Sequence, residues 1–487
     1  MTQAKKSPSM ALLSNPLKRF LSIGAALFFL MVQGTCLSAQ DLRLPDIFSD
    51  NMVLQQNDTV ALWGWGGPGA RIKVWNSWNQ DTVRTLSDSY ANWRLVLKTP
   101  AAGGPYTLTI QGAGSSVVIH NILIGEDWLC SGQSNMEFSA SWKTLVNWKE
   151  DTAQAQFPRI RFFHVQRMTS NYPETEVRGR WEECTPSSMF WFSSVGYFFG
   201  RMLSEKLQVP VGLIESAWGG TPVETWMPDS IFSSDPVLSA SAHLLHPAPW
   251  CPMVPAVCFN AMINPLIHFP IAGTIWYQGE TNTGNPGTYE RAFSKMIGCW
   301  RNLWGKDFPF YFVQIAPFNY GIGDSGALVR EAQLATYRTV PRTGMVVITD
   351  ITSDTNNIHP TDKVDVGERL ALWALANDYG NRGITFSGPL YRSMEIQGRR
   401  IRVSFDFAGS GLKVTSKEVT GLWIAGMDRK FYPAQSRLQD SVLVAWSAKV
   451  PQPVALRFGF SNTATPDLFN QEGLPASPFR TDDWPIP

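Results

Sequence analysis

The sequence predicts an α/β protein in which a parallel sheet is flanked by an antiparallel β-module on each side. Between residues 121 and 388, apolar strand-like runs alternate with helix-like segments, a pattern typical of parallel sheets. In residues 40–120 and 389–487, short alternating runs are separated by Gly, Pro and Asn clusters, as in antiparallel sheets. The length of 487 residues also favours several domains over one.

The N-terminus has the pattern of a signal peptide over residues 1–39. Basic residues precede an uncharged apolar run at 20–32, and Leu37-Ser38-Ala39 offers a small-residue cleavage site. The run is shorter than the roughly 20 residues of a membrane span, so we expect no stable membrane insertion after cleavage. The alternatives are a buried N-terminal helix and a lipid anchor at Cys36. The prediction is export to the periplasm or the medium.

Composition excludes several classes of partner. The chain has 41 Lys+Arg against 40 Asp+Glu and only 17% charged residues. It therefore lacks the excess of positive charge that binding to nucleic acid requires. Five cysteines follow the signal peptide, and Cys251 with Cys258 could close a short disulfide loop. No CxxC, HExxH or Cys/His cluster has zinc spacing, so we expect neither a metal nor another cofactor.

The three parts are expected to differ in structure. Residues 40–120 are expected to form a β-sandwich-like module, residues 121–388 the α/β core, and residues 389–487 a second β-module. Core strands are predicted at 128–130, 211–214, 273–277, 310–315 and 345–349. Core helices are predicted at 195–207, 289–303, 328–338 and 364–379. A Ser- and Pro-rich stretch at 229–252 is expected to cross the surface near the site.

Ser134 and His359 are the candidate nucleophile and base. Ser134 follows the first core strand on a tight strand-to-helix turn where Gly132 permits close backbone approach; the alternative is a helix N-cap serine. His359 lies in the loop 354–360, after another strand. Ligands of open α/β sheets gather outside the carboxyl ends of the strands, so these two residues are expected to meet there.

Two further strand ends carry hydrogen-bond donors for a developing oxyanion. Gly219 and Gly220 follow the strand at 211–214, and their N–H groups are unobstructed by side chains. Gln278 and Asn282 follow the strand at 273–277 and carry amide hydrogens. A serine, glycines, amides and a histidine in this order favour a serine hydrolase.

Four segments together resemble the sialate O-acetylesterase family of SGNH-type hydrolases. They are residues 125–136 (GEDWLCSGQSNM), 218–221 (WGGT), 276–282 (WYQGETN) and 358–360 (IHP). Residues 44–54 and 474–482 are similar to the family as well, so nearly all of the exported chain is covered. The resemblance implies a flavodoxin-like three-layer hydrolase core without a metal, acting to remove O-acetyl groups from sugars.

The resemblance also implies roles for individual residues. Ser134 would be the nucleophile and His359 the base and then the acid. The oxyanion hole would consist of the Ser134 N–H, Gly219 or Gly220, and Gln278 or Asn282. SGNH hydrolases commonly carry Asp three residues before the histidine, where this chain has Asn356. Asp354 is therefore our first candidate to orient the imidazole, with Asp350, Asn356 or a backbone carbonyl as alternatives.

The substrate is expected to be an acetylated glycan. The candidate substrate contacts are Trp218, Trp226, Trp276 and Glu280, and Trp250 also flanks the site. The alternative for Glu280 is that it only holds its loop in place. Acetylated xylan or xyloglucan is the alternative to acetylated sialic acid, and a non-catalytic glycan-binding protein is an alternative of another class. The sequence leaves the oligomeric state open.

Overall fold

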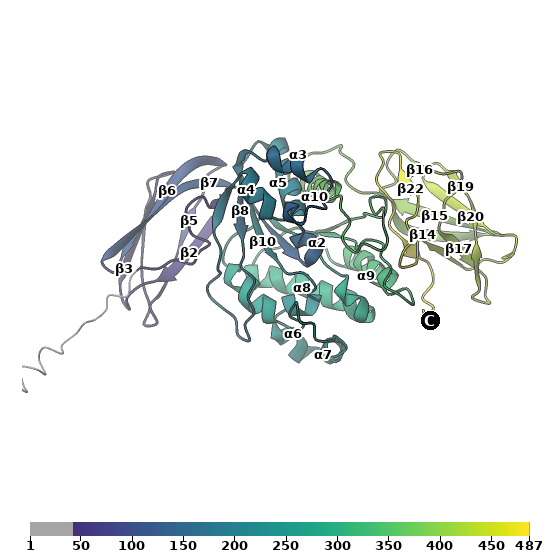
Figure 1. The fold of residues 1–487 in the computed structure, drawn as a ribbon, viewed down its shortest axis with the longest axis horizontal. Helices are drawn as coiled ribbons and strands as arrows, with labels where there is room; N and C mark the ends of the chain where they lie inside the picture. The colour runs from purple at the N-terminus through teal and green to yellow at the C-terminus, as the bar shows by residue number, and fades with distance from the viewer. Residues whose placement is uncertain (1–41, 487) are drawn as a thin grey trace, which may run out of the picture.

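The computed structural model describes residues 42–486, so the predicted signal peptide at 1–39 lies outside the described residues. The molecule is elongated, with an N-terminal β-region, a central α/β region and a C-terminal β-region following one another along its length (Figure 1). The α/β class and the two flanking antiparallel regions therefore agree with the pattern of the sequence.

A mostly parallel sheet forms the centre of the molecule. Its strand order is β13-β12-β11-β7-β10-β8-β9, and every neighbouring pair is parallel except the antiparallel pair β8 and β9. Without β8 and β9, the strands taken in chain order stand as 2-1-3-4-5, so the order reverses at β7. The strands are β7 (Ser115–Gly132), β8 (Phe157–His164), β9 (Trp181–Cys184), β10 (Val211–Ala217), β11 (Gly273–Tyr277), β12 (Phe310–Val313) and β13 (Thr343–Val346).

Strand β7 joins the N-terminal region to the central sheet. Its first half pairs with β6 in antiparallel fashion, and its second half lies between the parallel strands β10 and β11. Exposed and less exposed residues alternate up to Asn121, whereas residues 122–132 are all buried. The alternating pattern is that of a strand with one face buried, and the continuous burial is that of a strand covered on both faces. The expected boundary at residue 120 thus falls within one strand.

The N-terminal region consists of short strands joined by turns. β2 and β5 form an antiparallel pair, while β3 pairs with β4 and β6, and β1 pairs in parallel with β7. The strands are β1 (Val53–Gln55), β2 (Thr59–Trp65), β3 (Arg71–Asn76), β4 (Thr82–Leu86), β5 (Asn92–Lys98) and β6 (Gly103–Gly112).

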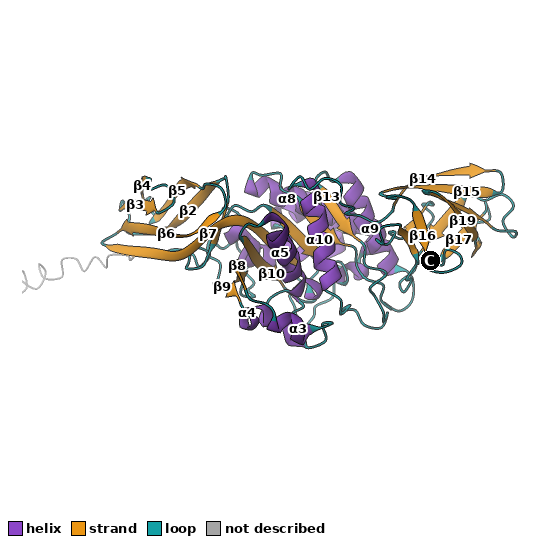
Figure 2. Ribbon diagram, turned by 90° about the horizontal axis from the view of Figure 1, so that it is seen from above, coloured by secondary structure: helices purple, strands orange, loops and turns teal. Residues whose placement is uncertain are grey.

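Four helices cover the two faces of the central sheet (Figures 1 and 2). Helices α5 (Ser194–Leu207) and α10 (Val364–Asn377) pack on one face, and α8 (Tyr289–Trp304) and α9 (Ser325–Thr339) on the other. Side chains of a strand alternate between faces, and successive residues of β11 accordingly join different hydrophobic clusters: Ile275 and Tyr277 one, Trp276 the other. These helices correspond to the four predicted from the sequence.

The remaining helices are short. The stretch at 229–252, expected to be a surface excursion, contains α6 (Asp229–Ser234) and α7 (Pro236–Ala242). The helix expected after the turn at Ser134 is α2 (Ser134–Glu137). The sequence did not predict α3 (Trp148–Ala153) or α4 (Pro186–Trp191), which are short and have too little periodicity to be recognised. Among the described residues, no helix combines the length and the apolar character needed to cross a bilayer.

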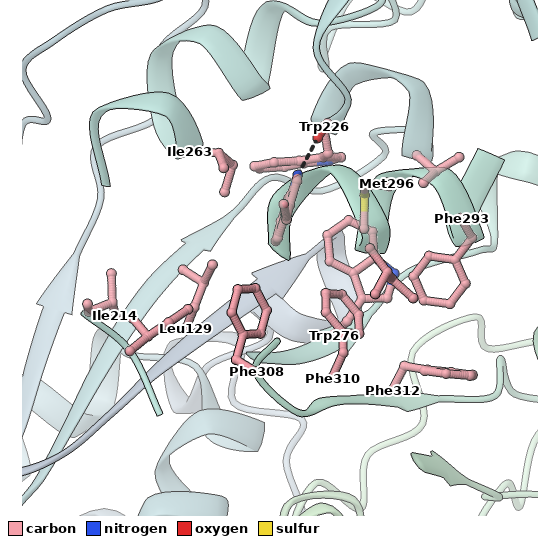
Figure 3. Packing of buried hydrophobic residues seen from close by; sticks show 14 of the residues in the cluster. Leu129, Ile214, Trp226, Ile263, Trp276, Phe293, Met296, Phe308, Phe310 and Phe312 are labelled. Carbon is pink, nitrogen blue, oxygen red and sulfur yellow. Dashed lines mark hydrogen bonds between the residues drawn. The ribbon is translucent and has the colours of Figure 1, made fainter. Parts of the chain in front are cut away.

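Two of the tryptophans expected to contact a sugar belong instead to the hydrophobic core. Trp226 and Trp276 are fully buried, with their rings edge to face at 6.2 Å between centroids. Figure 3 shows Trp276 among Phe293, Phe310 and other apolar side chains. Their expected role is therefore wrong: nearness in sequence to a strand end does not decide which face of the sheet a side chain occupies.

The C-terminal region consists of antiparallel sheets. Two sheets have four strands each, in the orders β14-β15-β20-β19 and β18-β17-β21-β23, and β16 pairs with β22. The strands are β14 (Leu390–Gln397), β15 (Arg400–Asp406), β16 (Leu412–Val414), β17 (Leu422–Ala425), β18 (Phe431–Pro433), β19 (Gln435–Gln439), β20 (Val442–Trp446), β21 (Ala455–Phe458), β22 (Leu468–Asn470) and β23 (Phe479–Arg480). Arg480 forms an ion pair with Glu331 of α9, which ties this region to the core.

The cysteines of the described residues are unpaired. Cys251 and Cys258, which the sequence suggested as a possible disulfide, are both free and buried. Burial raises the pKa of the Cys258 thiol to about 12, so this sulfur stays protonated at neutral pH.

The close packing of α5 on α10 is expected to depend on Gly367. A Cβ at this position would lie 2.7 Å from the Val195 carbonyl oxygen and 2.8 Å from the Phe199 nitrogen. We expect Gly367→Ala to lower the free energy of unfolding by about 1–3 kcal/mol, measured by urea denaturation. Gly298→Ala in α8 is the matched control, because nothing lies within 4 Å of its Cβ, and it should raise stability by about 0.5–1 kcal/mol. Equal effects of the two changes would contradict this explanation.

Candidate active site

Ser134 stands at the point where the strand order of the sheet reverses. It is the first residue of α2, separated from the end of β7 by Gln133 alone, and is partly buried. Gly132 makes this turn possible: its φ is +141°, and a Cβ there would lie 2.2 Å from the carbonyl oxygen of Tyr277. Only glycine fits between the strands at this position, so the backbone itself presents the serine at the sheet edge.

The structure brings Ser134 and His359 together. Their Oγ and Nε2 atoms lie 2.9 Å apart, although 225 residues separate them in sequence. The imidazole packs edge to face against Trp142, with ring centroids 5.1 Å apart. Burial, followed by the positive charge of Lys363, lowers the pKa of His359 to about 4. The imidazole is therefore neutral at physiological pH and able to accept a proton.

None of the groups suggested to orient His359 is hydrogen-bonded to its ring in residues 42–486. Asp354 is exposed, and its Oδ1 accepts from the N–H of Asn356 at 2.9 Å. Asp350 is held by the guanidinium of Arg369 through two contacts of 2.8 and 2.7 Å. The first choice from the sequence, Asp354, thus does not reach the imidazole, because its side chain turns back to its own loop.

A buried network beside Ser134 connects three segments of the site. Asn135 Nδ2 donates to Glu280 Oε1 at 2.6 Å and to the carbonyl oxygen of Ile358 at 3.0 Å. Lys363 Nζ donates to Asn135 Oδ1 at 2.6 Å. Since Ile358 directly precedes His359, this one amide joins the serine turn to the histidine loop and to the segment after β11.

Burial changes the protonation of both charged members of this network. It lowers the pKa of Lys363 to about 7 and raises the pKa of Glu280. The Lys363 ammonium lies over the rings of Phe138 and Tyr277, at 4.8 and 5.1 Å from their centroids. Glu280 borders the cavity; its Oε1 accepts from Asn135, whereas its Oε2 is buried without a hydrogen-bond partner in the described part of the chain.

The amides of Gln278 and Asn282 are not directed at Ser134. Gln278 Nε2 donates to the Thr221 carbonyl and to Asn282 Oδ1, at 3.2 and 2.8 Å. Asn282 Nδ2 donates to Glu224 and Asn285. Both side chains are fully buried, so their expected place in an oxyanion hole is wrong. They brace the loop that follows β11 against the loop that follows β10.

Other donors are free at the site. Ser134 begins α2, so its N–H has no acceptor within the helix. Gly219 N–H donates to Glu137 Oε2, but the N–H of Gly220 has no acceptor among the described residues. Gln133 Oε1 accepts from Gly279 and Thr281, which leaves Nε2 free of protein acceptors in the described part of the chain.

A cavity of about 430 Å³ opens at Ser134 and His359. Of the tryptophans expected to contact substrate, Trp218 lines it, and so does Trp250, whose side chain is 71% exposed. Glu137 and Arg167 form an ion pair in its wall. Within residues 42–486, no group of three or more His, Cys, Asp or Glu side chains is arranged to hold a metal ion.

Sequence reasoning missed several residues that shape the site. Gln133 and Asn135 flank the nucleophile directly, and Lys363 follows His359 by four residues. A lysine just before an apolar helix reads as a surface residue, and only the structure shows that it is completely buried. Trp142 and Glu137 lie outside every motif recognised in the sequence.

Comparison with known proteins identifies relatives of this arrangement. Residues 125–376, more than half of the chain, match the model of a family described as carbohydrate esterase, sialic acid-specific acetylesterase. The chain is 30% identical to rat sialate O-acetylesterase over 423 residues, covering 73% of this chain and 77% of the relative. The human enzyme of the same name is 30% identical over 390 residues, with coverage of 73% and 74%.

A solved structure is similar over nearly the whole length. A carbohydrate acetylesterase from Xanthomonas citri superposes with a TM-score of 0.83 at 36% sequence identity, covering 91% of this chain and 100% of that one. The similarity therefore extends through both β-regions as well as the central sheet. The chain belongs to the family of carbohydrate esterases described as sialic acid-specific acetylesterases.

Proposed function

We propose that this protein is an exported serine esterase that removes O-acetyl groups from carbohydrates through an acetyl-enzyme. As a member of its family, it is a carbohydrate O-acetylesterase. The observation that carries the mechanism is the 2.9 Å contact between Ser134 Oγ and His359 Nε2, which both line an open cavity. The same contact speaks against a non-catalytic glycan-binding protein.

The first half of the reaction transfers the acetyl group to Ser134. His359 Nε2 takes the hydroxyl proton while Oγ attacks the acetyl carbonyl carbon, and the carbonyl oxygen becomes an oxyanion. The N–H groups of Ser134 and Gly220 and the Nε2 of Gln133 are the donors proposed for it. His359 then gives its proton to the sugar oxygen, the C–O bond breaks, and the sugar hydroxyl leaves.

The second half releases acetate. A water molecule gives a proton to His359 and attacks the acetyl-serine carbonyl, and collapse of the second oxyanion returns the proton to Ser134 Oγ. We propose that His359 works as one half of a dyad, without a carboxylate on Nδ1. The network of Asn135, Glu280 and Lys363 would hold its loop instead.

The fold supports an SGNH-type core. The 2-1-3-4-5 order of β10, β7, β11, β12 and β13 is that of flavodoxin-like sheets, whose ligands bind where the order reverses. We propose the division into residues 40–120, 121–388 and 389–487, with β7 shared by the first two units. Export would follow from the signal peptide proposed at 1–39.

The names of the curated relatives favour an acetylated sialic acid as substrate. The xylan and xyloglucan alternative shares the same chemistry, so acetate release decides between them. Released acetate should be measured over a panel of O-acetylated sialosides, xylans and xyloglucans. Hydrolysis of the xylans and xyloglucans alone would refute acetylated sialic acid as the substrate but would still support the esterase activity.

Removal of either member of the dyad should abolish turnover. We expect Ser134→Ala and His359→Ala each to lower kcat/KM on an activated aryl acetate by at least about a thousandfold, because nucleophile and base act as one unit. Ser353→Ala and His243→Ala are matched controls on exposed residues and should retain wild-type rates. Rates in the dyad variants equal to wild type would refute the esterase mechanism.

The acid limb of the pH profile should lie unusually low. The base must be neutral, and its pKa of about 4 keeps it neutral well below the ordinary value of 6.5. We therefore expect kcat/KM to hold its plateau through weakly acidic pH and to fall only as the pH approaches 4. An acid limb at pH 6.5 in the wild type would contradict this expectation.

Lys363 should contribute to that low pKa. Lys363→Met removes the nearby positive charge, so the acid limb is expected to move to higher pH, although burial of the imidazole keeps the shift partial. Lys430→Met, at an exposed position, is the control and should leave the profile in place. A profile that Lys363→Met leaves unmoved would show that this charge does not act on His359.

A further inference from the structure

A second and larger cavity lies next to the one at Ser134. Its volume is about 860 Å³, twice that of the catalytic cavity, and it is lined by residues of β8, β9, α4 and the turn Ala140–Trp142. Strands β8 and β9 and helix α4 lie side by side (Figure 2). The chemical steps at Ser134 make no use of this space.

The two cavities share a wall. Trp142, Glu137 and Arg167 line both of them. On the catalytic side, Trp142 contacts the imidazole of His359, and Glu137 accepts from the N–H of Gly219. A molecule with its acetyl group at Ser134 would therefore pass Trp142 to enter the larger cavity.

Exposed tryptophans gather at these two cavities. Four tryptophans of residues 42–486 are strongly exposed: Trp142 (39%), Trp191 (67%), Trp250 (71%) and Trp423 (45%). The first two line the larger cavity, and Trp142 and Trp250 line the catalytic one. Burying an indole ring is energetically favourable because the ring has a large apolar surface. Three exposed tryptophans at one place therefore indicate a surface that binds a ligand.

Apart from Phe162 and Phe192, the remaining side chains that line the larger cavity are polar. Gln166, Ser188 and His164 contribute amide, hydroxyl and imidazole groups, and Arg178 is exposed, with no carboxylate partner in the described part of the chain. Flat rings beside hydrogen-bonding side chains suit a sugar, which presents apolar C–H faces and hydroxyl edges. A purely apolar ligand would leave the Gln166 amide and the Arg178 guanidinium without hydrogen-bond partners.

We propose that the larger cavity binds the sugar units next to the acetylated one, with Trp191 as a stacking platform. The substrate is then an acetylated oligosaccharide or polysaccharide rather than a single acetylated sugar. This inference rests on the proposed function, because it places the acetyl group at Ser134.

Chain length provides the first test. The wild-type protein is assayed with acetylated xylose and acetylated xylo-oligosaccharides, and with free O-acetylated sialic acid and an O-acetylated sialyl-oligosaccharide. In at least one series, kcat/KM should rise about tenfold or more from one sugar unit to several. Equal rates at all lengths, or turnover of the single acetylated sugars without turnover of any oligosaccharide, would overturn the inference.

Trp191→Ala provides the second test. The ratio of kcat/KM on the oligosaccharide to kcat/KM on an aryl acetate should fall about tenfold, mainly through KM, because a stacking contact is lost. Trp191→Phe should restore part of the preference. Trp423→Ala, at the exposed tryptophan of β17, is the matched control and should keep the wild-type ratio. Trp142 is avoided because it also contacts His359.

Binding to an inactive variant separates the two hypotheses. Calorimetric titration of Ser134→Ala with the same oligosaccharides should show binding that Trp191→Ala weakens in the double variant. Such binding without aryl acetate turnover in the wild type would refute the proposed function but keep the subsite. If the wild type hydrolyses the aryl acetate but Trp191→Ala changes neither oligosaccharide binding nor the oligosaccharide preference, the subsite is refuted and the esterase function is retained.

Discussion

The side chain of Asn135 is the constraint on which the site depends. Its amide donates to Glu280 and to the backbone before His359, and its oxygen accepts from Lys363. Three segments far apart in sequence are thereby fixed around one buried group. An unpaired amide would be costly at this depth, so the network is stable only when all three segments are in place. The position of His359 relative to Ser134 follows from that requirement.

The same burial sets the electrostatics of the site. An imidazole without a carboxylate partner, close to a buried ammonium, favours its neutral form, and the pKa of His359 falls to about 4. In a triad, a buried carboxylate would raise that pKa and stabilise the imidazolium. Here the hydrogen bond from Asn135 to the Ile358 carbonyl holds the loop, so the loop is positioned without the charge stabilisation that an aspartate adds in a triad.

Much of the central fold could be predicted because periodicity and turn residues are local. Helices α5, α8, α9 and α10 and the core strands follow from their apolar patterns, and Ser134 and His359 from their places after strands. The short helices α3 and α4 and the strands β8 and β9 could not be predicted in this way. Their residues acquire structure mainly from contacts with the sheet, and α4, β8 and β9 contribute residues to the lining of the larger cavity.

The sequence by itself determined which chemical groups stand at the ends of the strands, since strand periodicity and glycine positions are encoded locally. Only the tertiary structure decided which groups face the cavity. Trp226, Trp276, Gln278 and Asn282 turn into the interior, and Asp354 turns back on its own loop, while Gln133, Trp142 and Lys363 come to the site. The physical reason is that a side chain's partners come from distant segments, and burial and hydrogen bonding with those partners choose its direction.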